Sequence, residues 1–138
     1  MTQTDETIRD ILRTTRTIAV VGWSPNPGRA SHQVAAFLKS RGYRVFPVNP
    51  GHAGSEALGE TVVADLASLP VVVDMVDIFR RSEDVLPVVE QAVALDGVKT
   101  IWMQLGISNA DARAMAEARG LQVVEDRCPA IEIPRLSV

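Results

Sequence analysis

A repeated order of segments constrains the fold of this chain more than any other feature: a short apolar run, a loop, and then a stretch with helical periodicity. It is clearest in residues 17–42, where the apolar run 18–21 ends at Gly22, a loop rich in Pro and Gly follows, and an amphipathic segment begins at Ser31. Four consecutive apolar residues suit a strand that is covered on both faces, as in a parallel sheet. Residues 17–42 therefore predict a strand, a loop and a helix capped by Ser31.

The same order recurs along the chain, with a short helix expected first because Ile8, Ile11 and Leu12 recur at helical spacing. Further strands are expected at 43–48, 71–79, 98–105 and 121–126, helices at 84–96 and 108–119, and a short strand at 61–64 followed by one helical turn. This alternation, without polar linkers or internal repeats, predicts one open α/β domain over residues 1–138. Its sheet is expected to be mainly parallel, with about five strands and the first strand central.

Composition narrows the function classes. The chain has 138 residues and a formal net charge of −3, which argues against nucleic acid as its main partner. No window approaches the roughly 20 apolar residues of a membrane span, and the N-terminus lacks the apolar core of a signal peptide. Its one cysteine, Cys128, cannot form an internal disulfide, which favours a reducing compartment. We therefore expect a cytoplasmic protein without a membrane or nucleic-acid partner.

The ligand site is expected at the carboxyl ends of the strands. In an open parallel sheet, ligands bind where the strand order reverses, which here falls between the first strand and the strand ending at Phe79. Four segments would meet there: residues 22–31, 48–52, 79–81 and 104–106.

These segments are rich in cations and neutral hydrogen-bonding groups, and no acid belongs to them. The positive charges are those of Arg29, Arg80 and Arg81, and the neutral groups include Ser24, Asn26 and Ser31. Guanidinium groups and a helix N-terminus favour phosphates, so the predicted ligand is a polyanion.

The loop after the first strand narrows the choice of polyanion. An NAD site usually has GxGxxG and an acid at the end of the second strand, whereas this chain has GWSPNPG and ends that strand with Asn49 and Pro50. Without that carboxylate, a ribose that carries a phosphate loses a repulsive neighbour. Coenzyme A and NADP both carry such a phosphate, and charge alone does not separate them.

Several motifs in order carry a family resemblance. The segments VVGWSPNPGRASHQVAAFLKSRGYRVFPVNPG, VDMVDIFRR, IWMQLGI and VVEDRC together resemble the small stand-alone CoA-binding proteins. Those proteins are similar to the CoA-binding domain of succinyl-CoA synthetase alpha subunits and related acyl-CoA ligases. The resemblance covers residues 8–136 and implies a doubly wound, Rossmann-like fold. The ligases carry their phosphorylated histidine in a further domain, so ligase activity is not implied.

The resemblance also implies roles for individual residues. It implies that the phosphates are contacted by Gly22, Ser24, Asn26 and Arg29. It also implies that the adenine and ribose are lined by Val48, Asn49 and Pro50. The ligases tend to have Pro-Gly-Lys after the second strand, where this chain has Pro50-Gly51-His52. Because a histidine is mostly neutral at pH 7, Arg80 or Arg81 is expected to supply the charge instead.

We therefore predict a protein that binds CoA or an acyl-CoA by its phosphates, without catalysis of its own and without a metal. Phe79 and Val48 are expected to sandwich the adenine, with the pantetheine thiol toward Gln104 and Gly106. The alternatives are an NADP-dependent oxidoreductase and a regulatory module that senses acyl-CoA. The predicted binding residues are Gly22, Ser24, Asn26, Arg29, Ser31, Val48, Asn49, Pro50, Phe79, Arg80, Arg81, Gln104 and Gly106.

Three further side chains are of types that can carry chemistry. Asp74 and Asp77 lie three apart on a predicted strand and so point to opposite faces, which excludes a carboxylate pair between them. Cys128 is expected to be a small buried hydrophobe rather than a thiol partner for CoA.

Overall fold

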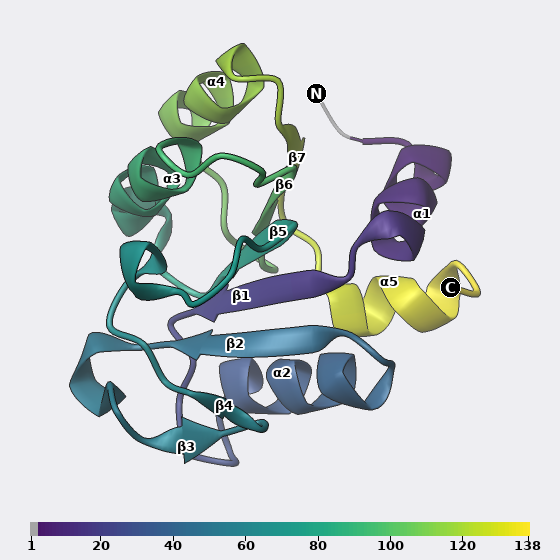
Figure 1. The fold of residues 1–138 in the computed structure, drawn as a ribbon. Helices are drawn as coiled ribbons and strands as arrows, with labels where there is room; N and C mark the ends of the chain where they lie inside the picture. The colour runs from purple at the N-terminus through teal and green to yellow at the C-terminus, as the bar shows by residue number, and fades with distance from the viewer. Residues whose placement is uncertain (1–2) are drawn as a thin grey trace.

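A five-stranded sheet forms the middle layer of the protein, for which the computed structural model describes residues 3–138 (Figure 1). The strand order is β2-β1-β5-β6-β7, and every neighbouring pair is parallel. The α/β class, the parallel sheet and the reversal of strand order between β1 and β5 are confirmed. The middle strand is β5, however, and β1 lies between it and the edge strand β2. The strands are β1 (Thr17–Val21), β2 (Arg44–Val48), β5 (Met75–Ile78), β6 (Thr100–Met103) and β7 (Gln122–Val124).

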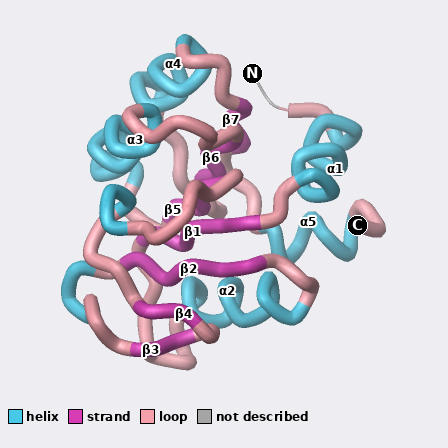
Figure 2. Tube along the Cα trace, viewed as in Figure 1, coloured by secondary structure: helices cyan, strands magenta, loops and turns pink. Residues whose placement is uncertain are grey.

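Helices cover both faces of this sheet (Figure 2). One face carries α1 (Asp5–Thr14), α2 (Ala30–Ser40) and α5 (Pro129–Arg135), and the other carries α3 (Val85–Val93) and α4 (Ala110–Ala118). Successive side chains of a strand point to opposite faces of the sheet. Val20 therefore packs in the core under α2, and Val21 packs in the core under α3. Burial on both faces explains why the strands are apolar runs without polar alternation.

The region between β2 and β5 contains a small hairpin. Strand β3 (Glu56–Ala57) pairs antiparallel with β4 (Glu60–Thr61), and the turn residues Leu58 and Gly59 have φ angles of 58° and 76°. Two positive φ angles in a two-residue loop are those of a type I′ turn. The expected helical turn is present at Leu66–Ser68, but the expected strand at 61–64 is reduced to the end of β4 and a bridge between Val63 and Val48. Two more short 3₁₀ turns lie at Pro50–His52 and Ser82–Asp84.

The predicted strand 71–79 is wrong in its first half. Asp74 precedes β5, where its carboxylate accepts hydrogen bonds from the backbone N–H groups of Arg16 (2.8 Å) and Thr17 (3.2 Å). The Asp74 side chain thus provides hydrogen-bond acceptors for the backbone N–H groups at the start of β1. Val71 and Val72, which precede Asp74, are exposed. Asp74 therefore hydrogen-bonds the backbone at the start of β1 and forms no pair with Asp77.

Two helix starts also differ from the prediction. Helix α2 begins at Ala30 with Arg29 as its N-cap residue, so the expected capping role of Ser31 is wrong and Ser31 lies buried in the first turn. Helix α4 begins at Ala110, two residues after the expected start at residue 108, because the side chain of Asn109 caps it by accepting a hydrogen bond from Ala112 N at 2.9 Å.

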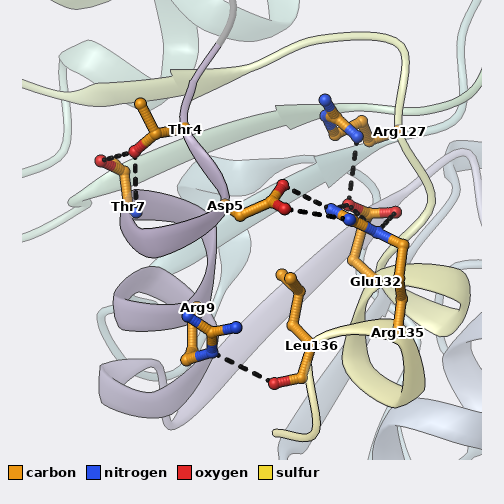
Figure 3. Close-up of polar contacts among 8 residues, drawn as sticks. All are labelled: Thr4, Asp5, Thr7, Arg9, Arg127, Glu132, Arg135 and Leu136. Atoms are coloured by element: carbon orange, nitrogen blue, oxygen red, sulfur yellow. Dashed lines mark hydrogen bonds and ion pairs between the residues drawn. The ribbon is translucent and has the colours of Figure 1, made fainter.

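The C-terminal helix α5, which the sequence analysis did not predict, is tied to α1 by charged side chains (Figure 3). Arg135 Nη2 lies 2.8 Å from Asp5 Oδ1 and 2.7 Å from Glu132 Oε1, and Arg127 Nη1 lies 3.2 Å from the same Glu132 oxygen. Glu132 is buried between the two guanidinium groups. The hydrogen bond from Arg135 lowers the pKa of Asp5. We call these four residues the terminal clamp.

Within residues 3–138, no helix has the length and apolar character needed to cross a bilayer.

Candidate binding cleft at the carboxyl edge of the sheet

A large hollow opens where β1 and β5 part, beside the first turn of α2. It has a volume of about 640 Å³ and is called the main cleft below. Such a volume falls within the range of small-molecule sites. Its lining residues are Gly22, Ser24, Arg29, Ala30, Ser31, Val34, Asn49, Phe79, Arg80, Arg81, Gln104, Leu105, Ile107 and Cys128. All four segments expected to converge therefore contribute to one hollow.

Gly22 makes the close approach of the strand ends possible. Its N–H donates to Val48 O at 3.0 Å, and Phe79 N donates to the preceding Val21 O at 2.8 Å. Its φ is +89°, and a Cβ at this position would lie 2.2 Å from Phe79 O and 3.1 Å from Arg80 Nη1. Only glycine fits a positive φ with a backbone oxygen this close. Gly22 thus brings the ends of β1 and β5 together beside the main cleft, which Gly22 and Phe79 both line.

The loop after Gly22 is held by its own side chains. Ser24 Oγ accepts from Asn26 N at 3.1 Å, and Asn26 Oδ1 accepts from Gly28 N at 2.9 Å. Ser24 lines the main cleft, but the exposed Asn26 does not. The nearby Trp23 is buried beneath the loop, with its ring stacked on His32.

Asn49 fastens this loop to the end of β2. Its Nδ2 donates to Trp23 O at 2.7 Å, and its Oδ1 accepts from Gly51 N at 2.8 Å. Both ends of the amide are therefore used within the protein. Asn49 sets the distance between two walls of the main cleft.

A second hollow of about 230 Å³ lies on the α3 side of the same sheet edge. Its lining includes Val48, Pro50 and Arg80, so Arg80 borders both hollows. Of these two hollows, Phe79 lines the main cleft and Val48 lines the second, so the two residues lie in different hollows. This arrangement does not form the expected adenine sandwich.

Two other residues lie outside both hollows. The exposed Gly106 donates its N–H to Asp126 Oδ1 at 2.6 Å, while its neighbours Leu105 and Ile107 line the main cleft. His52 is exposed in the turn Pro50–His52.

The main cleft is cationic. No carboxylate is among its lining residues in the described chain, and it has Arg29, Arg80 and Arg81 around it. Arg81 is 77% exposed and paired with Asp84 at 3.1 Å, so part of its charge is neutralised. Arg29 and Arg80 form no ion pair with any residue of 3–138. They add to the positive end of α2, whose first-turn N–H groups lie beside the main cleft.

Asp77 is an acidic residue near this site whose partner the sequence analysis did not predict. It lies on β5, is fully buried, and has the side chain of Gln104 beside it. Burial raises the pKa of its carboxyl group well above the usual value. An acid within an apolar strand was the available signal, but its partner comes from another strand and could not be read from spacing.

Comparisons with known proteins identify the family of this chain. The family described as "CoA binding domain" matches residues 16–134. The "uncharacterized protein YneT" of Bacillus subtilis (strain 168) is 38% identical over 121 residues, which are 88% of this chain and 87% of that protein.

Two solved structures show the same fold. A protein of Thermus thermophilus, described as "cell-free ID.343", has a TM-score of 0.91 and 36% identity, covering 97% of this chain and 99% of that chain. The dinucleotide-forming acetyl-coenzyme A synthetase 1 of Ca. Korarchaeum cryptofilum has a TM-score of 0.68 and 27% identity, covering 83% of this chain but 26% of that chain. The match over residues 16–134, together with the YneT likeness, shows that this chain belongs to the CoA-binding domain family.

Proposed function

We propose that this protein binds coenzyme A or an acyl-CoA by its phosphates in the main cleft, without chemistry of its own. Membership of the CoA-binding domain family supports the ligand class. The chain corresponds to about a quarter of the acetyl-coenzyme A synthetase that it resembles, so that enzyme's reaction is not transferred to it. The single cysteine favours a reducing compartment, which is the basis for proposing a cytoplasmic location.

The observation that carries the proposal is the meeting of Gly22, the first turn of α2 and two unpaired arginines around one hollow. We assign the pyrophosphate to the first turn of α2, where N–H groups and the helix dipole favour anions. Arg29 and Arg80 supply the charge for the phosphates. Because Arg80 also borders the second hollow, the adenine is assigned there, beside Val48 and Pro50.

The proposal is tested by thermal unfolding in the presence of CoA, dephospho-CoA, NADP or NAD. Ligand that binds only the folded state raises the Tm in proportion to ln(1 + [L]/Kd). We expect CoA to give the largest rise, dephospho-CoA a smaller one and NAD none. A rise with NADP alone would instead support an NADP-dependent enzyme.

Arg80→Ala should reduce the CoA-induced rise in Tm while leaving the Tm of the free protein nearly unchanged. The matched control is Arg13→Ala, which removes an exposed arginine at the end of α1, far from the main cleft in the fold. The proposed role of Arg80 is excluded if both variants show the same CoA-induced rise as the wild type.

A further inference from the structure

Asp77 is buried without a charged partner. Its carboxyl group lies on β5 between Val20 of β1 and Trp102 of β6, in the layer covered by α2 and α5. The Trp102 indole N–H is not available to it, because it donates to Arg127 O at 2.7 Å. Burying a carboxyl group without a hydrogen bond is costly, so a partner is required.

Gln104 is that partner. It directly follows β6, is 7% exposed, and lines the main cleft. When its amide nitrogen faces Asp77, Nε2 lies 2.9 Å from Oδ1 and 3.2 Å from Oδ2. No other side chain among residues 3–138 donates a hydrogen bond to this carboxyl group, and beside an ionised Asp77 the reverse orientation would place two acceptors face to face.

An amide has an acceptor at one end and donors at the other, so fixing one end decides what the other end offers. We propose that Asp77 is a positioning residue, which holds the Gln104 Nε2 and so leaves Oε1 as the group that the main cleft presents to a ligand. Gln104 then selects a ligand that brings a hydrogen-bond donor to this wall.

This inference rests on the proposed function and refines it. The pantetheine arm of CoA carries two amide N–H groups and, in the free thiol, an S–H group, all beyond the phosphates. The nucleotide end of CoA would be bound by the arginines and α2, at a distance from Gln104. The pair Asp77–Gln104 should therefore affect recognition of the arm and leave recognition of the nucleotide end unchanged.

The test measures binding by calorimetry for Asp77→Asn, Gln104→Leu and the double variant. Two ligands are compared: CoA, and adenosine 3′,5′-bisphosphate, which lacks the arm. In Asp77→Asn the ionised carboxyl group, which offers only acceptors, is replaced by an amide that offers both a donor and an acceptor, so the Gln104 amide is no longer held in one orientation. We expect Gln104→Leu to bind CoA roughly tenfold more weakly, the value of about one hydrogen bond, and Asp77→Asn to bind CoA more weakly than the wild type by a smaller factor.

Two further results test the proposal. The double variant should bind CoA no more weakly than Gln104→Leu alone, because Asp77 acts only through Gln104. All variants should bind adenosine 3′,5′-bisphosphate as the wild type does. Wild-type affinity for CoA in Asp77→Asn, or a double variant that adds the two single losses, would overturn the proposal.

A measurement without ligand separates this inference from the proposed function. The Gln104 side-chain NH₂ signals, identified by their loss in Gln104→Leu, should exchange slowly with water in the free wild-type protein and quickly in Asp77→Asn. Fast exchange in the wild type would show that Nε2 already faces the cleft, as it would beside a protonated Asp77, and would overturn the inference. If the exchange is slow but the wild type does not bind CoA, the orientation stands, and both the proposed function and the assigned recognition of the arm fail.

Discussion

Gly22 is the residue on which the geometry of the main cleft depends most. It combines a positive φ with a Cβ position only 2.2 Å from the backbone oxygen of Phe79. A side chain there would push β1 and β5 apart at the point where their ends define the cleft. The free energy cost therefore has two parts, the strained φ and the steric overlap.

Gly22→Ala should lower the free energy of unfolding by at least about 2 kcal/mol, measured by denaturant titration. Its control is Gly120→Ala, since Gly120 also has a positive φ of +81° but nothing within 4 Å of a Cβ. That variant should cost only about 1 kcal/mol, the value of the φ alone. Equal losses in the two variants would contradict the close approach described here.

The sequence identified most of the residues around the main cleft, but not how each is used. Ser24, Arg29, Arg80 and Gln104 could be predicted because each follows a strand end or begins a helix. The partner of Gln104 could not, since Asp77 lies on a different strand and the contact depends on sheet register. The placement of Val48 and Phe79 in different hollows likewise depends on which side of the sheet each residue faces.

At the scale of elements, capping chemistry explains the shifted start of α4. Asn109, one residue after the expected start of the helix at residue 108, provides the capping hydrogen bond. Helix α2 begins without a side-chain cap, which leaves its first-turn N–H groups beside the main cleft. Helix α5 has only seven residues, but Pro129 in its first turn was a signal that could have revealed it.

The terminal clamp makes the packing of α5 on α1 dependent on pH. Arg135 lowers the pKa of Asp5, so the unfolded chain binds more protons there than the folded chain does at mildly acidic pH. The stabilisation by Asp5 is therefore complete above the ordinary aspartate pKa of about 3.9 and is lost as the pH falls through the lowered folded value.

Asp5→Asn should lower the Tm at pH 7 by no more than a few degrees, because the pair is exposed and screened by solvent. The difference from the wild type should vanish when both are unfolded near pH 2. Asp10→Asn on the same helix, whose side chain has no ion pair among the described residues, is the control. A Tm difference for Asp5→Asn that persists unchanged to pH 2 would contradict the clamp.

At the scale of the whole molecule, the fold brings separate chain segments to one edge of the sheet. The strand order reverses between β1 and β5, so the helices that follow these strands lie on opposite faces and leave the edge open (Figure 1). The apolar runs and the loop spacing were sufficient to predict this arrangement. The sequence did not predict that β5 is the middle strand and that β1 lies beside it, because strand order depends on long-range pairing that no local pattern contains.

The central claim is that CoA binds with its phosphates at the first turn of α2, and amide NMR of the labelled protein titrated with CoA tests it most directly. We expect the largest shifts at the backbone amides of Gly22, Ser31 and Arg80, with little change at Asp74 and Lys99 on the opposite edge of the sheet. Unchanged amides at Gly22 and Ser31 in the presence of saturating CoA, or the largest shifts at the opposite edge, would contradict it.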